Sequence, residues 1–271
     1  MVRALWSAAS GVSAQQNNVD TISNNLANVN TTGYKTEVAE FKSLLYQNVQ
    51  TKTTSANGET KPISAQIGLG VRNSSVTSIF TQGSFYESSS NMAFALSGAG
   101  FFGIQGADGG NYYTKNGNFY LSKGTNGLTL CTSDGYPVKD TTGKAIVFSD
   151  TLDTSQITVS NNGEFSYPDA SNNPVSLGIT IGTFQFTNPA GLEKTDSSLY
   201  MATAASGAFI NEATSTNAQK TVIKQGYLEG SNVQVVDEMV NLIVAQRAYE
   251  MNSKAIQAAD EMMGQANNLR R

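Results

Sequence analysis

The sequence contains no histidine, a single cysteine and few charged residues, and each shortage excludes a class of function. Its 271 residues include 17 lysines and arginines, 21 aspartates and glutamates, and no histidine. Without histidine the chain cannot form a Ser-His-Asp or Cys-His catalytic centre, and with Cys131 alone it has no plausible zinc cage. Cys131 cannot form an intrachain disulfide, and in the strand-like run LTLCTSDG we expect it to be a small buried residue. We therefore expect no cofactor and no metal site.

The charge and hydropathy patterns exclude further partners. The formal net charge is -4, so the chain lacks the cationic surface that collects phosphates. We therefore expect no nucleic-acid partner, and acidic membranes are equally poor partners. No apolar run reaches the roughly 18 residues that a membrane span needs, which predicts no direct membrane insertion.

The first residues resemble a secretion signal only in part. After Arg3, the run ALWSAASGVSA ends in Val-Ser-Ala, which looks like a signal-peptidase site. Ser7, Ser10 and Gly11 interrupt the apolar region that such a signal requires. We therefore expect these residues to remain in the mature chain.

A seven-residue repeat near the N-terminus predicts a long amphipathic helix within residues 1–33. Asn30-Thr31-Thr32 are weak helix formers, and Gly33 suits the left-handed position after a helix end. Two heptad lines three positions apart form a coiled-coil seam over residues 5–29. The residues of the two lines are Leu5, Val12, Val19 and Leu26, then Ala8, Gln15, Ile22 and Val29.

The C-terminus has a matching pattern over residues 231–271. Ser231, followed three positions later by Gln234, forms a capping-box pattern ahead of VVDEMVNLIVAQRAYEMNSKAI. Alanines flank the heptad line, and small residues allow a second helix to approach closely, so we expect the two terminal helices to pair. The heptad line consists of Val235, Leu242, Tyr249, Ile256 and Met263.

The middle of the chain predicts antiparallel strands. Asn-Gly and Asp-Gly dipeptides, which favour tight hairpin turns, alternate with aromatic and β-branched runs over residues 84–210. Residues 34–83 are expected to be a linker that carries an extended hairpin or loop arm at about 46–66, and residues 211–230 a return linker. The fold class is therefore α+β. The residues taken to mark the arm are Tyr46, Lys61, Pro62 and Gln66.

Two enzyme-like patterns have simpler explanations. Residues 98–103, GAGFFG, fit G-x-G-x-x-G, but a strand and a turn follow them, whereas a dinucleotide site needs a helix there. A glycosidase needs only two suitably spaced carboxylates, yet each candidate acid lies in a polar, turn-like segment. The candidate acids are Asp134, Asp140, Asp150 and Asp153.

The N-terminal helix is unusual because it carries amides where a solvated helix carries charges. Asp20 is the only ionised side chain between Ala4 and Tyr34. Asparagine is a poor helix former, so we expect these amides to bond to other protein or to line a neutral channel. Because two such helices alone are marginal, we also predict ends that are loose in the monomer and ordered in an assembly. The amides are Asn17, Asn18, Asn24, Asn25 and Asn28.

Several blocks, in order along the whole chain, resemble the bacterial flagellar rod and hook axial proteins. One departure is MAFAL at 92–96, where relatives often have an acidic residue. Length and the arm resemble members that build the distal rod rather than the proximal rod or the hook. The blocks are NNLANVNTTGYK (24–35), TQGSF (81–85), SGAGFFGI (97–104), YTKNGNF (113–119), TNPAGL (187–192) and QGYLEGSNVQVVDEMVNLIVAQRAYEMNSKAI (225–256).

The resemblance implies a structural, non-enzymatic subunit of the flagellar basal body. Its terminal helices would form a tube around the channel that exports unfolded subunits, and the arm would bridge neighbours and help transmit torque. Implied partners are copies of itself, proximal rod proteins, hook or hook-junction proteins and possible surrounding ring proteins. Export through the flagellar apparatus, without a cleaved signal, would place it in the periplasm-spanning rod.

Three alternatives remain open at this point. Another axial protein, of the proximal rod or the hook, shares the terminal motifs. A secreted β-rich adhesin predicts a stable monomer with exposed binding loops, and a carbohydrate-acting enzyme predicts one indispensable pair of acids.

Overall fold

The computed structural model describes residues 2–50, 65–124, 127–150, 152–169, 173–195, 198–215 and 219–268. The chain forms two compact units. The first takes Met1–Ala27, Glu37–Thr77 and Gln234–Arg271, and the second takes Asn28–Thr36 and Ser78–Val233. The fold class is α+β, as the sequence predicts.

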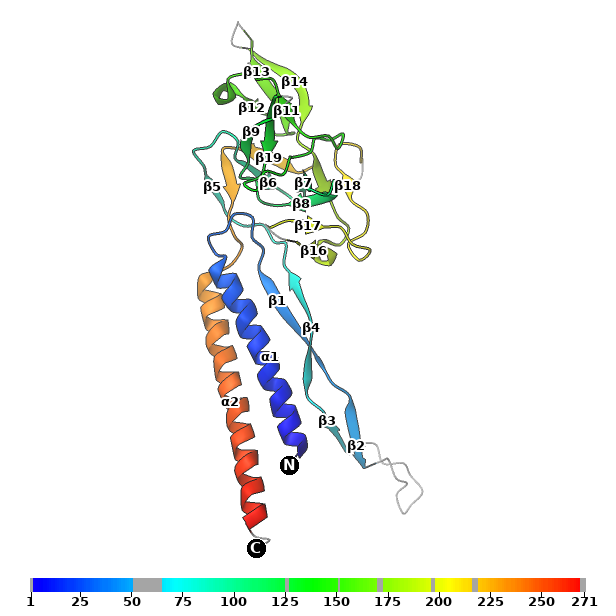
Figure 1. Cartoon of the computed structure of the whole chain (residues 1–271), viewed down its shortest axis with the longest axis vertical. Coiled ribbons are helices and arrows are strands. Elements are labelled where there is room, and N and C mark those ends of the chain that lie inside the picture. Colours follow the sequence, from blue (N-terminus) through cyan, green and yellow to red (C-terminus); the bar gives the residue numbers. More distant parts are fainter. Residues whose placement is uncertain are drawn as a thin grey trace. The chain divides into compact units, whose positions relative to one another are not determined.

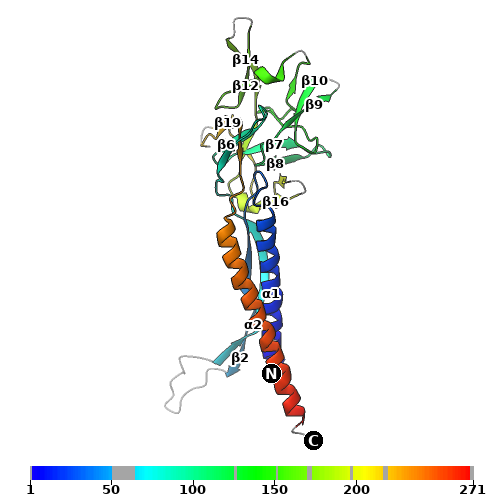
Figure 2. The same cartoon turned by 90° about the vertical axis from the view of Figure 1, so that its left-hand side faces the viewer.

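The first unit contains the two long helices, α1 (Val2–Ala27) and α2 (Val235–Asn268). With 26 and 34 residues they are about 39 and 51 Å long at 1.5 Å per residue. They lie side by side, which Figures 1 and 2 show from two directions. The prediction that the terminal helices pair within the chain is therefore confirmed, whereas a tube made from several chains is a separate question.

Helix α1 ends before its predicted segment does, and α2 begins later than predicted. Helix α1 ends at Ala27, because residues after it form turns, with the N–H of Thr31 donating to the carbonyl of Asn28 at 3.1 Å. Gly33 does have a left-handed φ of 70°, but it lies outside the helix. Helix α2 begins at Val235, and the Ser231 hydroxyl accepts from the N–H of Val233 at 3.2 Å. Ser231 therefore does not cap α2 in the predicted way.

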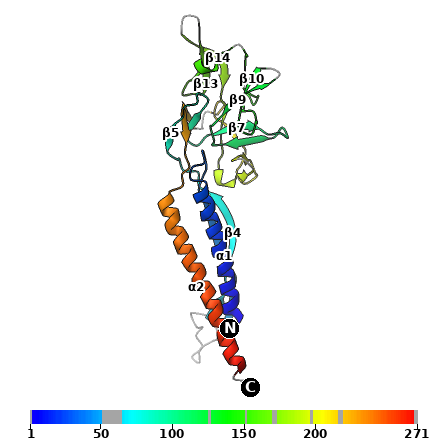
Figure 3. The same ribbon diagram turned by 60° about the vertical axis from the view of Figure 1, so that its left-hand side comes forward.

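Strands β1–β4 complete the first unit. β1 (Glu37–Ser43) pairs with β4 (Val71–Ser78), and β1 contacts α1. The N–H of Val71, the first residue of β4, donates to the Ser10 hydroxyl of α1 at 3.2 Å, and Figure 3 shows both elements from the side. β2 (Tyr46–Gln50) and β3 (Ala65–Gly68) are antiparallel, with Tyr46 opposite Gly68. The predicted arm residues Lys61 and Pro62 lie outside the described residues.

The second unit is built from short antiparallel strands, as predicted. Its largest sheet has six strands in the order β16-β17-β8-β7-β15-β18. Residues 211–230, predicted as a return linker, contain β19 and β20, which pair with β6 and β5. The strands of the sheet are β7 (Phe101–Gln105), β8 (Asn111–Thr114), β15 (Thr183–Gln185), β16 (Glu193–Lys194), β17 (Tyr200–Met201) and β18 (Ile210–Asn211).

The remaining strands form smaller sheets, of which the three-stranded ones have the orders β11-β10-β9 and β12-β13-β14. Short 3₁₀ helices occupy Thr154–Gln156 and Pro189–Gly191. The strands are β5 (Phe85–Glu87), β6 (Phe94–Ser97), β9 (Tyr120–Gly124), β10 (Gly127–Cys131), β11 (Val147–Phe148), β12 (Thr158–Val159), β13 (Glu164–Pro168), β14 (Pro174–Thr180), β19 (Val222–Gln225) and β20 (Tyr227–Glu229).

Strand β7 divides the core of the second unit. Phe101 and Phe102 are neighbours in β7, so their side chains point to opposite faces and enter different hydrophobic clusters. Gly100 approaches so closely that an added Cβ would lie 2.5 Å from the Thr221 hydroxyl. The GAGFFG run is therefore a close strand crossing ahead of a buried phenylalanine pair. Cys131 is buried at the end of β10, as predicted.

Candidate functional site

The helix pair is packed through small residues. Ala8 of α1 and Ala245 and Ala259 of α2 are buried. Gly11 marks the tightest approach, because an added Cβ would lie 2.9 Å from the amide nitrogen of Asn252. Of the alanines that flank the predicted heptad line, Ala245 and Ala259 therefore occupy buried positions of α2, whereas Ala255 and Ala266 are exposed.

The predicted seam residues are distributed unevenly. Ile22 is buried, whereas Val235 and Tyr249 are 39% and 40% exposed. Their role in packing between copies stays a prediction. The partly buried members of the seam are Leu5, Val12, Val19, Leu26, Val29, Leu242, Ile256 and Met263.

Asn25 shows why an amide is needed near the end of α1. Its side chain is 1% exposed, its Nδ2 donates to the Glu37 carbonyl at 2.8 Å, and its Oδ1 accepts from the Glu37 N–H at 2.9 Å. The amide thus bonds both backbone groups of the first residue of β1, as a neighbouring strand would. A neutral group with one donor and one acceptor is required, which excludes lysine and glutamate.

The other predicted amides have varied surroundings. Asn24 donates to the Glu37 carboxylate at 3.3 Å, and Asn28 accepts from the Thr31 hydroxyl at 3.1 Å. Asn17 and Asn18 are partly buried. A position facing a channel or another subunit remains a prediction for this group.

Helix α2 carries an exposed apolar face, called here the α2 apolar patch. Five residues within nine positions are more than half exposed on a helix whose opposite side packs on α1. Apolar patches of this kind mark contacts with another molecule. The patch consists of Val236 (73% exposed), Met239 (52%), Val240 (54%), Ile243 (57%) and Val244 (62%).

The paired strands β2 and β3 also expose apolar side chains. Leu45 is 82% exposed, Tyr46 61% and Ile67 45%, while Gln66 is exposed as well. A two-stranded ribbon with exposed apolar residues is marginal by itself in water. These residues are therefore suited to contact another molecule.

A buried ion pair closes the second unit where the chain enters and leaves it. Lys35 and Glu229 are 0% and 1% exposed, and the ammonium lies 2.5 Å from a carboxylate oxygen. Lys35 also donates to the Thr81 carbonyl at 2.7 Å, and the same Glu229 oxygen accepts from the Gly83 N–H at 3.0 Å. The pair thus ties together residues that follow α1, precede β5 and precede α2 in the chain.

Two further side chains complete this junction. Asn232 accepts from the N–H of Thr36 at 2.7 Å and donates to the Ile79 carbonyl at 2.9 Å. Lys115 donates to the Gly98 carbonyl at 2.9 Å and lies 5.0 Å from the centre of the Phe101 ring. Burial lowers the pKa of Lys115 to about 8, and Glu229 partly opposes the shift. This junction was not predicted from the sequence, although a lone lysine and a lone glutamate in two charge-poor motifs were a signal.

The candidate acids of the enzyme alternative serve local structure. Asp140 accepts from the N–H groups of Thr142 and Lys144 at 2.8 Å, and Asp153 caps the first 3₁₀ helix. Asp150 lies 3.3 Å from Lys123 at the surface, and Asp134 is exposed. In the described part of the chain, no three acidic, cysteine or histidine side chains gather as metal ligands. Among the same residues, neither helix is apolar enough over sufficient length to cross a membrane.

Comparison with known proteins gives matches along the whole chain. Residues 5–35 match the family "flagella basal body rod protein". Residues 95–167 match the family "flagellar hook protein FlgE/F/G D1 domain", and residues 224–269 match the family "flagellar basal body rod FlgEFG protein C-terminal". The flagellar basal-body rod protein FlgG of Borreliella burgdorferi is 44% identical, with 100% of both chains covered.

Two further relatives have the same name. The FlgG protein of Agrobacterium fabrum is 42% identical over 96% of this chain and 97% of its own. The FlgG protein of Buchnera aphidicola from Acyrthosiphon pisum is 38% identical over 99% of this chain and 100% of its own. The first and last matched regions contain both halves of the buried Lys35–Glu229 pair.

Proposed function

The chain belongs to the family of the flagellar basal-body rod protein FlgG, and from this premise we propose that it is a structural subunit of the distal rod. Family membership favours a structural role over catalysis. Copies of the chain assemble into a rigid, hollow helical shaft that carries torque from the motor to the hook and encloses an export channel. The observation that carries self-assembly is the α2 apolar patch, which a solitary chain leaves in water.

Burial of the patch between copies supplies the driving force. A side chain such as valine or isoleucine gains roughly 1.5–3 kcal/mol when it is fully buried, so five half-exposed residues provide several kcal/mol per contact. Because every copy offers the same patch and contacts a different surface, the assembly does not close and extends as a helical filament. Packing among copies then adds stability to α1 and α2. Amide exchange along both helices is therefore expected to be slower in the assembled rod than in the dilute chain.

The second part of the proposal concerns the paired strands β2 and β3 with Leu45, the residue before β2. This segment is an arm that contacts a neighbouring copy through Leu45, Tyr46 and Ile67, which are exposed in the single chain. Such a contact at a distance from the helices resists twisting between subunits. Axial partners are proximal rod proteins and hook or hook-junction proteins, and ring proteins surround the rod in the periplasm. Export proceeds without a cleaved signal.

Two aspartates placed in the α2 apolar patch test the proposal. Val236→Asp with Val244→Asp changes the two most exposed patch residues and leaves the contact with α1 in place. We expect wild-type protein at high concentration to form tubes with a central lumen in electron micrographs, and the variant to remain monomeric. Gln257→Asp, on an exposed part of α2, adds charge without touching the patch and should assemble normally. Unchanged assembly of the double variant contradicts the proposal.

A further inference from the structure

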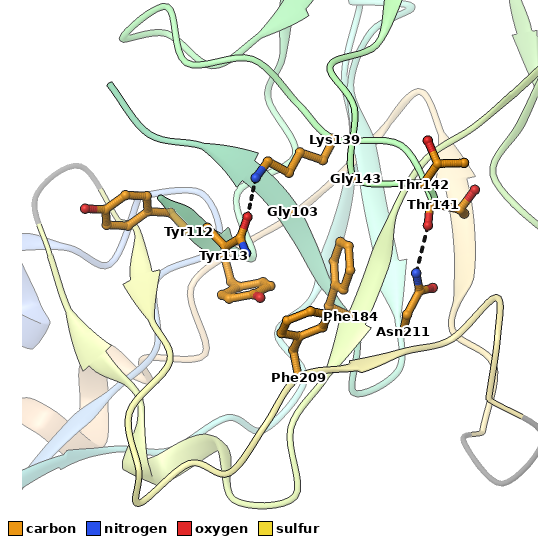
Figure 4. Close-up of a pocket in the computed structure, with 11 residues that line it drawn as sticks. Gly103, Tyr112, Tyr113, Lys139, Thr141, Thr142, Gly143, Phe184, Phe209 and Asn211 are labelled. Carbon is orange, nitrogen blue, oxygen red and sulfur yellow. Dashed lines mark hydrogen bonds between the residues drawn. The ribbon is translucent and has the colours of Figure 1, made fainter. Parts of the chain in front are cut away.

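A small pocket opens on the second unit beside the six-stranded sheet. Its volume is about 140 Å³, and its walls come from β7, β8, β15, the end of β18 with the residue before that strand, and the loop of residues 139–143. Figure 4 shows the rings of Tyr113, Phe184 and Phe209 on one side and Lys139 with the two threonines of the loop on the other, while the Tyr112 ring points away from them. This pocket is distinct from the α2 apolar patch and from the arm.

The aromatic side of the pocket is a cluster of rings set at steep angles to one another. The rings of Tyr113 and Phe184 are 5.5 Å apart, and those of Phe184 and Phe209 are 5.6 Å apart, all meeting edge to face. Phe184 lies over Gly103, where an added Cβ would be only 2.4 Å from its ring. Phe209 is 46% exposed at the edge of the cluster, so its face is available to a ligand.

The opposite side of the pocket holds a buried positive charge. Lys139 is 7% exposed, and its backbone is held between Gly103 and Gly182 by hydrogen bonds of 2.8 and 2.9 Å. Its ammonium donates to the neutral side-chain oxygen of Asn111, the one hydrogen bond it makes within the described residues. Two of its three N–H groups therefore remain for another acceptor.

No acid of the described chain neutralises this charge. The nearest acid in sequence, Asp140, turns back into its own loop and accepts from Thr142 and Lys144. Burial lowers the pKa of Lys139, and no acidic side chain opposes the shift. A buried cation without a counter-ion is costly, and the cost is relieved when an anion enters.

We propose that this pocket binds a single carboxylate carried on a small apolar body, with the carboxylate on the Lys139 ammonium and the body against Phe184 and Phe209. One positive charge matches one carboxylate, whereas a phosphate brings more charge than the pocket balances. The size fits as well, since a cavity of about 150 Å³ accommodates benzene. Nucleotides and oligosaccharides are too large.

The carboxylate has two possible sources with the same chemistry. It belongs either to a free small acid or to an acidic side chain or chain terminus of another copy. The proposal does not depend on rod assembly, because all of its residues lie within the second unit of one chain. If the chain did not assemble into a rod, the pocket could therefore still bind a carboxylate. If the pocket bound no carboxylate, the chain could still assemble into a rod.

Titration of the dilute full-length chain with benzoate tests the pocket, with benzamide as the uncharged probe of the same shape. Amide resonances of Gly103 and Gly143 should shift on binding, and benzoate should bind about tenfold or more tightly than benzamide. Lys139→Gln should reduce benzoate affinity about tenfold. Lys123→Gln removes a surface lysine of the same unit, whose side chain is 74% exposed, and should change nothing. Equal affinity for the two probes, or no binding, overturns the proposal.

A second variant covers the case in which Lys139→Gln does not fold. Phe209→Ala changes an exposed ring, so the fold is kept, and both probes should bind several-fold more weakly; unchanged binding contradicts the proposed position of the apolar body. The rate of self-assembly in excess benzoate then shows whether the natural carboxylate comes from a free acid or from another copy. Slower self-assembly of the wild type, with no effect on Phe209→Ala, identifies a carboxylate of another copy. An unchanged assembly rate with benzoate still bound identifies a free acid.

Discussion

The ammonium of Lys35 lies 2.5 Å from the carboxylate of Glu229, a residue 194 positions later, and both side chains are inaccessible to water. The second carboxylate oxygen of Glu229 is buried and has no hydrogen-bond partner among the described residues. Such a pair is a weak source of net stability, because desolvation of both charges offsets their attraction. Its main effect is specificity, since removal of one partner leaves the other charged and buried.

Glu229→Gln is therefore expected to destabilise the chain by about 3–5 kcal/mol, the typical cost of an uncompensated buried charge. Lys35→Met with Glu229→Leu removes both charges and should recover most of this loss. The free energy of unfolding from urea titration checks both values. A loss below about 1 kcal/mol for Glu229→Gln would show that the junction admits water and that the pair is not buried in solution.

The lowered pKa of Lys115 should make the free energy of unfolding depend on pH in an unusual way. Its pKa is lowered to about 8 in the folded chain by burial, against 10.5 when unfolded. Between these values the unfolded chain binds more protons, so stability rises as pH increases from 8 towards 10.5. Burial raises the pKa of Tyr113 to about 12, so stability falls again above pH 10 as unfolded tyrosine ionises. The effect of Lys115 on stability is therefore best measured between pH 8 and pH 10, below the pH at which unfolded tyrosine ionises.

Lys115→Met isolates this effect. Over this pH range the wild type should gain about 2–3 kcal/mol relative to the variant, the order of magnitude of two pKa units. Urea titrations at pH 8, 9 and 10 measure the difference. Lys123→Met serves as the control, because its surface ammonium is 74% exposed. Parallel curves for the wild type and Lys115→Met would show that Lys115 titrates normally.

The heptad pattern predicted both helices, and the Asn-Gly and Asp-Gly turns predicted the antiparallel second unit, because those signals are local. The end of α1 was not predicted correctly. Gly33 suits a helix end, but its N–H donates to the carbonyl of Glu229 at 2.8 Å, a partner almost 200 positions away. No local pattern contains that information.

The role of the heptad residues in packing between copies stays a prediction. Heptad positions identify apolar lines, yet they do not say whether the partner is the same chain or another copy. In the structure, Ala245 and Ala259 lie buried in the helix pair, while Val236 and Val240, outside the predicted line, remain exposed. Asn25 was predicted to face a channel or another subunit, whereas in the chain it is buried and bonds its own strand β1.

Asn25→Asp tests the role of the amide at the end of α1. The carboxylate keeps an acceptor for the Glu37 N–H but loses the donor to the Glu37 carbonyl, and it buries a charge. The expected loss is about 1–3 kcal/mol at pH 7, measured by thermal unfolding. Burial raises the pKa of the new acid, so the loss should shrink as pH falls and the acid is protonated. Ser23→Asp, on an exposed position of α1, should lose much less.

Substitutions of Gly11 test how closely α1 and α2 approach each other. Alanine at this position would meet the side-chain amide of Asn252 at 2.9 Å, a flexible group that can move aside. Since alanine favours a helix over glycine by about 0.5–1 kcal/mol, Gly11→Ala should leave helix content and stability unchanged or slightly higher. The larger side chain in Gly11→Leu does not fit even when Asn252 moves aside. It should force the helices apart, lower the melting temperature and prevent assembly. Circular dichroism and sedimentation measure both effects. Leucine tolerated as well as alanine would mean that the helices are not in close contact at this point.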